Sequence, residues 1–217
     1  MTEAAAVLTE QSNIHPGPTS AEVVRDIFAV CFPKAASALD ITYGQGGFWK
    51  WDWIGRRLSL AASDRYTQPA QEDLDCALLW MGDHDILGPA YSIPAPPGEG
   101  WKWDVVAFDP PHSAIGPDNF GKPFEGWSDR YGASRINEGA PQKYADIAKL
   151  LVRGVEVACS YARQGAIVKT KNVVESGKTY RSIYLVESVA HACGWHIEDE
   201  VIFVGRGPKQ PSGRRIL

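Results

Sequence analysis

Four consecutive residues, Asp109-Pro110-Pro111-His112, carry the clearest chemical signal in the sequence. Two prolines fix the backbone and remove two N–H donors, so the carbonyl groups stay free to accept hydrogen bonds. A carboxylate and a neighbouring carbonyl can together accept hydrogen bonds from both N–H groups of one amino group. The lone pair of that nitrogen is then withdrawn from conjugation with the ring and directed at an electrophile, while a flat histidine stacks on the ring that bears the amine. The pattern predicts a site for a planar amine; a merely stiff turn is the alternative.

A second chemical signal is the glycine-rich segment 38–49, ALDITYGQGGFW. A short apolar run ends at Asp40 and is followed by Thr42 and then by glycines, which let a backbone pass close to a ligand without a Cβ clash. The carboxylate and the hydroxyl add polar partners for a charged small molecule. The segment lacks the full GxGxxG fingerprint of dinucleotide sites. A plain tight turn therefore stays open beside a nucleotide-cofactor site.

Two further aspartates follow apolar runs of the chain. Asp64 comes after a predicted strand at 57–62, where open α/β folds place an acid on the hydroxyls of a ribose. A solvated turn is the alternative for this residue. Asp83 follows the run 74–81, which reads as a passage from helix to strand, and it is placed to receive the exocyclic amine of an adenine. Asp85 competes with Asp83 for that role.

Alternating strands and helices are predicted to position these residues. The sequence predicts strands at 36–39, 57–62, 103–108, 166–169 and 200–204, and helices at 21–31, 141–163 and 182–193. Thr19-Ser20 would begin the first helix and Pro33 would end it, whereas Gly165 and Gly194 would cap the later two. This order predicts an α/β fold, a doubly wound sandwich around a mostly parallel sheet.

The domain prediction is one domain with two loose ends. Residues 1–17 are expected to form a flexible arm, 18–205 the folded domain and 206–217 a mobile tail. The segment 88–101 is rich in proline and glycine and is expected to be a loop. Residues 113–140 lack periodicity, and so long a loop in a compact domain is typical of a lid or substrate loop.

Charge and composition limit the classes of partner. A net charge of −4 and a pI near 5.7 exclude a global basic field, so any contact with nucleic acid has to be local. Basic residues gather at 169–181 and 209–215, where solvated surface charge is the alternative to phosphate contacts. Four widely spaced cysteines predict structural thiols in a reducing compartment. The absence of a signal-like start and of a long apolar run predicts a cytoplasmic protein without a membrane span.

Together these motifs resemble those of S-adenosylmethionine-dependent methyltransferases of class I, of the kind that methylate amino groups in DNA. Residues 40–49 resemble the first motif of that family, and 109–112 resemble its catalytic motif, (D/N/S)-P-P-(Y/F/W/H). The chain is particularly similar to small DNA methylases of phage and actinobacterial type, in which an Arg-Tyr-Gly like 130–132 and a segment like 168–178 follow in the same order. The resemblance covers about residues 18–215.

The resemblance implies a Rossmann-like class I methyltransferase sandwich, with S-adenosyl-L-methionine as cofactor and no metal. It implies nucleic acid as partner, DNA in preference to RNA, and adenine N6 or cytosine N4 as the atom that is methylated. The catalytic residues would be Asp109, Pro110, Pro111 and His112, with His112 in place of the more common Tyr or Phe. Cofactor contacts would come from Asp40, Thr42, Tyr43, Gly44, Gly46, Asp64 and Asp83, and substrate contacts from Arg130, Tyr131 and Lys169.

Other functions stay open at this point. RNA or the amide of a protein side chain would suit the same acceptor geometry, since any planar amine can be held in this way. The length of 217 residues leaves no room for a separate target-recognition domain. Sequence choice would then fall to the loop 113–140 and the C-terminal arm, or the enzyme would have relaxed specificity or work with a partner. The partners considered are a second copy of the chain, in a homodimer, and a specificity partner. A non-catalytic cofactor-binding protein is the alternative outside the enzymes, and a nicotinamide oxidoreductase ranks third.

Overall fold

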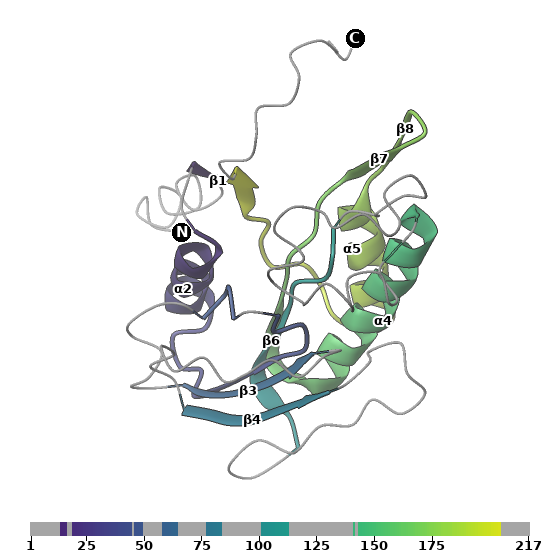
Figure 1. Cartoon of the computed structure of the whole chain (residues 1–217). Coiled ribbons are helices and arrows are strands. Elements are labelled where there is room, and N and C mark those ends of the chain that lie inside the picture. Colours follow the sequence, from purple (N-terminus) through teal and green to yellow (C-terminus); the bar gives the residue numbers. More distant parts are fainter. Residues whose placement is uncertain are drawn as a thin grey trace, which may run out of the picture.

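The computed structural model describes residues 14–16, 19–44, 46–49, 58–64, 77–83, 101–112, 141 and 143–204, with the backbone alone at 14–16, 77–83 and 203–204. Its centre is a five-stranded sheet in the order β4-β3-β2-β5-β6, in which all neighbours are parallel (Figure 1). The strands are β2 (Ser37–Asp40), β3 (Ser59–Asp64), β4 (Ala77–Asp83), β5 (Trp103–Phe108) and β6 (Ala162–Val168). The predicted α/β class with a mostly parallel sheet is confirmed.

The strand order reverses in the middle of the sheet. From β2 the chain adds β3 and β4 on one side, then returns to place β5 and β6 on the other. Asp40 at the end of β2 is in register with Ala107, two residues before Asp109. The carboxyl ends of β2 and β5 therefore lie side by side at this reversal, which is where open α/β sheets leave a crevice for ligands.

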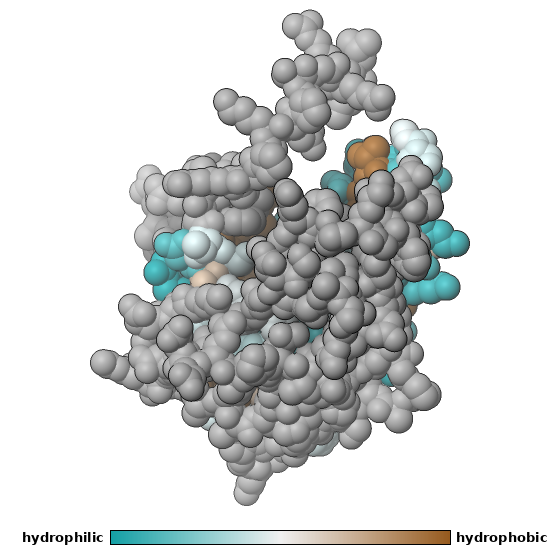
Figure 2. Space-filling view, viewed as in Figure 1, coloured by the Kyte–Doolittle hydropathy of each residue, from teal (hydrophilic) through white to brown (hydrophobic). Residues whose placement is uncertain are grey.

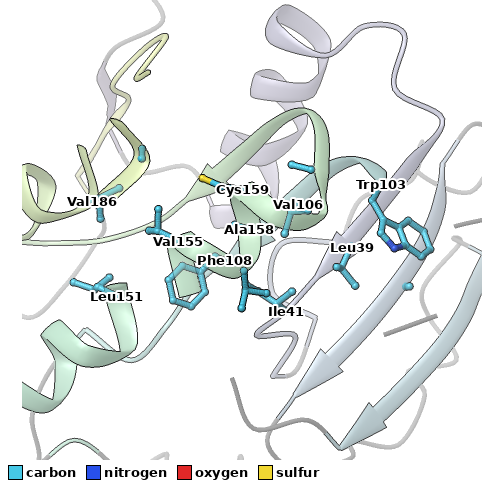
Figure 3. Packing of buried hydrophobic residues seen from close by; sticks show 14 of the residues in the cluster. Leu39, Ile41, Trp103, Val106, Phe108, Leu151, Val155, Ala158, Cys159 and Val186 are labelled. Carbon is cyan, nitrogen blue, oxygen red and sulfur yellow. The ribbon is translucent and has the colours of Figure 1, made fainter. Parts of the chain in front are cut away.

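Helices cover both faces of the sheet, and alternate residues of the strands supply the two cores. Figure 3 shows Phe108 and Val106 packed against α4 (Tyr144–Tyr161), and α5 (Ser182–Ala192) contributes Val186 to the same cluster. On the opposite face, Val105 and Ala107 pack with residues of α2 (Ser20–Cys31). Every residue of β2 and β5 is buried, as expected for parallel strands covered on both sides.

The start of α2 follows the predicted capping pattern. Thr19 Oγ1 accepts a hydrogen bond from the Glu22 backbone N–H at 3.2 Å, and the Glu22 carboxylate accepts one from the Thr19 N–H at 2.6 Å. This reciprocal pair satisfies two of the free N–H groups at the first turn. The helix ends at Cys31, as predicted, before Pro33.

The predicted helix 141–163 is wrong at both ends. α4 begins at Tyr144 and ends at Tyr161, because Ala162 is already extended and opens β6. Gly165, the predicted cap of this helix, lies inside β6 instead. The glycine is needed there for packing, since a Cβ would lie 2.5 Å from the ring of Phe32. For the third helix the prediction is confirmed, because α5 ends at Ala192 and Gly194 adopts φ +81° just after it.

Two small sheets outside the main one are not among the predicted elements. Residues 14–16, expected within a flexible arm, form β1 (Ile14–Pro16), which pairs in parallel with β9 (Ile202–Val204). The last predicted strand therefore exists but belongs to this separate two-stranded sheet. Strands β7 (Val173–Glu175) and β8 (Lys178–Tyr180) form an antiparallel hairpin. Strands of three residues are too short to show a periodicity. The predicted loop 88–101 lies outside the described residues except for Trp101, and the predicted loop 113–140 and tail 206–217 lie outside them entirely.

Asp104 fastens the amino edge of the sheet, opposite the edge that carries Asp40 and Asp109. Its buried Oδ2 accepts hydrogen bonds from the backbone N–H groups of Ala36 at 2.9 Å and Ser37 at 3.1 Å. Its Oδ1 accepts from Arg163 Nε at 3.0 Å and Gln164 Nε2 at 2.8 Å. Burial alone would raise the pKa of Asp104, but the Arg163, Ala36 and Gln164 contacts together hold it below its usual value.

Asp104→Ala is expected to lower the free energy of unfolding by about 2 to 4 kcal/mol, because it leaves the buried N–H and hydroxyl of Ser37 and the partly buried N–H of Ala36 without an acceptor. Urea unfolding at pH 7 measures the loss, with Lys149→Ala on the exposed side of α4 as the control. The pKa of the carboxyl is lowered by folding, so the difference between wild type and variant should shrink as the pH falls through that pKa. A loss below about 1 kcal/mol at pH 7 would contradict this role.

Candidate functional site

The site lies at the carboxyl edge of the sheet, where β2, β3, β5 and β6 end. Parallel strands deliver the residues that follow them to one edge, so residues far apart in sequence meet there. The described residues gathered at this edge are Asp40, Thr42, Tyr43, Gly44, Gly46, Asp64, Asp109, Pro110, Pro111, His112 and Lys169. Of the predicted residues, Asp83 ends β4 in register with Asp64, with its backbone alone described. Arg130 and Tyr131 lie outside the described residues.

Asp40 organises the glycine loop that follows β2. Its side chain is buried, with Oδ1 accepting the Thr42 backbone N–H at 2.8 Å and Oδ2 accepting Trp49 Nε1–H at 2.6 Å. The loop therefore leaves the strand and returns onto the same carboxylate nine residues later. Trp49 is not among the predicted site residues. It could have been predicted from its indole N–H, a hydrogen-bond donor inside an otherwise apolar motif. Asp40 therefore affects a ligand of this loop by fixing the conformation of the loop.

The protonation of Asp40 is unusual for an aspartate. Burial raises its pKa from 3.8 to about 7, even though the hydrogen bonds from Trp49 and Thr42 favour the charged form. The negative charges of Asp109 and Asp64 raise it further. Asp64 and Asp109 thus lie close enough to Asp40 for their charges to act on it, and this repulsion contributes to keeping a proton on Asp40 up to about pH 7.

Two glycines of the loop have backbone conformations with positive φ, +53° at Gly44 and +68° at Gly46. A Cβ on Gly46 would lie 2.7 Å from the hydroxyl oxygen of Tyr43, whose ring is buried beneath the turn. Gly47, by contrast, has open space where a Cβ would lie. The glycine at 46 is therefore required for packing on Tyr43, a reason that differs from the close approach to a ligand expected from the sequence.

Gly46→Ala is expected to destabilise the loop, because the substitution combines a strained φ with a clash against Tyr43. The expected loss in the free energy of unfolding is about 1 to 3 kcal/mol, measured by urea unfolding. Gly47→Ala is the matched control, since a methyl group meets nothing within 4 Å there. Equal stability of the two variants would show that the Tyr43 packing does not constrain the loop.

Hydrogen bonds between neighbouring loops hold the edge together. Thr42 Oγ1 accepts the Asp109 backbone N–H at 2.6 Å, which ties the loop after β2 to the loop after β5. Asp64 Oδ2 accepts the Gly44 N–H at 2.7 Å, which ties the same loop to β3. The predicted ligand contacts of Thr42, Gly44 and Asp64 are thus partly engaged in supporting one another. The Thr42 hydroxyl keeps its own proton to donate.

Asp109 is partly accessible, with 27% of its side chain exposed, whereas Asp40 is buried. Its Oδ1 lies 2.8 Å from Nε2 of His112, and its Oδ2 lies 2.9 Å from Nζ of Lys169. Burial would raise the pKa of Asp109, but His112 and the positive charge of Lys169 outweigh it, and the net pKa is lowered. Asp109 is therefore a carboxylate, able to accept hydrogen bonds, across the neutral range.

Lys169 connects the Asp-Pro-Pro-His motif with other elements. It follows β6, and its backbone N–H donates to the Phe108 carbonyl at 2.9 Å, so β5 and β6 stay paired up to the residue before Asp109. Its ammonium also lies 3.4 Å from Ser20 Oγ at the start of α2 and 5.4 Å from the centre of the Phe48 ring. Lys169 is predicted as a substrate-contacting residue, and the structure places it on the carboxylate of Asp109; Ser20 is not among the predicted residues.

Comparisons with known proteins find no relative from which a function could be transferred. No protein-family model, no curated protein and no solved structure matches the chain. Among the described residues, no three side chains of the metal-binding types are grouped to hold an ion. No helix in the described part of the chain is long and apolar enough to cross a membrane. The chemistry of the carboxyl edge is therefore the basis for a function.

Proposed function

We propose that the protein is an S-adenosylmethionine-dependent methyltransferase that modifies an exocyclic amino group, adenine N6 in DNA first and cytosine N4 second. The observation that carries the proposal is the position of Asp109. This ionised, partly exposed carboxylate follows β5, opens the Pro-Pro-His turn and lies beside the glycine loop of β2, where the strand order reverses. The strand order and the helices on both faces support the finer proposal of a Rossmann-like class I methyltransferase sandwich.

The residues of the carboxyl edge fit the proposed cofactor. S-adenosylmethionine supplies an electrophilic methyl group on a positively charged sulfur, and it also carries an ammonium group. Asp64 and Asp109 both raise the pKa of Asp40, so a cation bound at this edge would relieve the repulsion that keeps a proton on Asp40. The loop from Thr42 to Gly46 would hold the methionine part of the cofactor. Asp64 would hold the ribose, and Asp83, next to it in register, the adenine.

The target amine would be held by Asp109 and by the carbonyl of Pro110. Both groups would accept hydrogen bonds from the amine, so the nitrogen lone pair would lose its conjugation with the ring and be directed toward the methyl group. Lys169 shares the Asp109 carboxylate and keeps it ionised. His112, which contacts the same carboxylate at 2.8 Å, would leave it to stack on the target base once the base has been turned out of the duplex. The nitrogen would form a bond to the methyl carbon as the carbon–sulfur bond of the cofactor breaks, with S-adenosylhomocysteine as the leaving group. The nitrogen would then release one proton, which Asp109 or water accepts.

The direct test is transfer of a labelled methyl group from S-adenosylmethionine to separate pools of duplex DNA, single-stranded DNA, bulk RNA and protein. Label that digests to N6-methyladenine from DNA is the expected result. Label confined to RNA or protein would keep the chemistry and overturn the proposed substrate. If no pool is labelled although calorimetry shows that the cofactor binds, the proposed enzymatic activity is overturned and the protein is a cofactor-binding protein.

A further inference from the structure

The β7–β8 hairpin is a stiff projection of the fold. Figure 1 shows it extending beyond the ends of α4 and α5. Two residues, Ser176 at φ +50° and Gly177 at φ +78°, connect Glu175 to its cross-strand partner Lys178. Positive φ at both positions is the feature of the tight type I′ turn, whose twist matches that of paired strands. The two strands are therefore joined by a tight turn, with no longer loop at the tip of the hairpin.

The hairpin is also fixed on the first turn of α4, by Glu175 next to its turn and by Tyr180 at its base. Glu175 Oε1 accepts the Tyr144 backbone N–H at 2.8 Å, which occupies one of the free donors at the helix start. The rings of Tyr144 and Tyr180 stack with centroids 4.1 Å apart and an angle of 22° between their planes. Glu175 keeps its negative charge in this contact and lies directly opposite Lys178 in the hairpin, so the charge of Lys178 is offset in part.

Three exposed cations line this projection: Lys171, Lys178 and Arg181, called here the hairpin cations. Lys178 Nζ lies 5.1 Å from the centre of the Tyr180 ring, and Arg181 Nη1 donates to the Tyr184 hydroxyl at 3.0 Å. Aromatic contacts of this kind hold long basic side chains in place. The chain as a whole carries a net charge of −4, so this local excess of positive charge opposes the overall field.

The hairpin belongs to the same edge as the candidate active site. Lys169, on the Asp109 carboxylate, precedes Lys171 by two residues, and the chain continues from there into β7. On the face of the hairpin opposite Glu175 and Tyr180, Val174 is 67% exposed and pairs with Thr179, so this face is uncharged. Figure 2, in the same view as Figure 1, shows apolar and polar residues of this projection together at the surface. Cations beside an uncharged face suit a nucleic-acid strand, with its phosphates and its sugar edges.

We propose that the β7–β8 hairpin is a nucleic-acid grip, in which the hairpin cations bind the phosphates that flank the base held at Asp109. The choice of DNA as the strand rests on the proposed function. The cations position the strand without reading its sequence, because phosphate contacts carry no base information. Binding through the hairpin would release counterions and would weaken steeply as salt is added.

The test compares a triple variant, Lys171→Gln, Lys178→Gln and Arg181→Gln, with the wild-type protein in binding to a fluorescent DNA duplex over a range of salt concentrations. The slope of log affinity against log salt should become shallower by about 0.9 for each phosphate that the variant no longer neutralises. We expect a drop in affinity of at least about tenfold at low salt. The control variant, Lys34→Gln, Lys102→Gln and Lys149→Gln, removes the same charge elsewhere and should keep the wild-type slope.

Two outcomes separate this inference from the proposed function. If the hairpin variant keeps the wild-type salt slope, or if the control variant weakens binding as much, the grip is overturned even where methyl transfer to DNA is observed. If the wild-type protein transfers no methyl group but binds DNA through the hairpin cations, phosphate binding by the hairpin is supported and the proposed methyltransferase activity is overturned. Binding of S-adenosylmethionine to the hairpin variant, measured by calorimetry, should match the wild type and shows that the variant is folded.

Discussion

Asp109→Ala is expected to lower the rate of methyl transfer by at least about 100-fold, the loss typical when one preorganised polar contact of a transition state is removed. The substitution takes away the acceptor that frees the lone pair of the target amine. It also leaves Lys169 and His112 facing each other without the carboxylate that both contact. Single-turnover transfer from labelled S-adenosylmethionine to DNA is the measurement, since it reports the chemical step apart from product release.

Two companion variants show which property of Asp109 matters. Asp109→Asn keeps an acceptor oxygen of the same reach but no charge, so it should retain more activity than the alanine variant. Lys169→Met leaves the carboxylate in place and removes the cation that lowers its pKa. Loss of activity in Lys169→Met should therefore be recovered in part as the pH is raised, because Asp109 then ionises without help. Activity of Asp109→Ala within about tenfold of wild type would contradict a direct role in transfer.

The sheet and its aspartates can be predicted because their signals are local. Each buried strand is a short apolar run, and each run stops at residues that break regular structure, as at Asp40 and after Phe108. The predicted strand 103–108 coincides with β5, and the predicted strand before Asp64 agrees with β3 within two residues at each end. Since parallel strands present their carboxyl ends at one edge, local prediction is enough to bring Asp40, Asp64 and Asp109 together.

The contacts that define the site cannot be predicted in this way because they depend on which side chains meet in the folded chain. Lys169 reaches Asp109 from another strand, Trp49 holds Asp40 through its indole, and Gly46 is required by the ring of Tyr43. None of these pairings follows from the local pattern of apolar and polar residues. The pairing of β1 with β9 escapes prediction for the same reason, since each strand finds its partner at the other end of the chain.

The raised pKa of Asp40 makes the stability of the protein depend on pH. The free energy of unfolding of the wild-type protein is expected to fall by about 3 kcal/mol between pH 5 and pH 8, because a pKa difference of one between the folded and unfolded states corresponds to 1.36 kcal/mol. The folded state keeps a proton on Asp40 up to about pH 7, whereas an unfolded aspartate releases it near 3.8. This contribution is complete at pH values below 3.8 and is lost as the pH rises through 7. Urea unfolding across this range measures it.

Asp40→Asn isolates the effect because it cannot ionise. At pH 5 the variant should be less stable than wild type by about 1 to 3 kcal/mol, since an amide offers one acceptor oxygen to the two donors at Thr42 and Trp49. The two stabilities should converge toward pH 8, where wild type carries the cost of a buried charge. Parallel curves of stability against pH would show that Asp40 does not titrate in this range.

A positively charged cofactor at this edge should also flatten the wild-type curve of stability against pH, because it would lower the pKa of Asp40. S-adenosylhomocysteine, which lacks the charge on sulfur, should flatten the curve less.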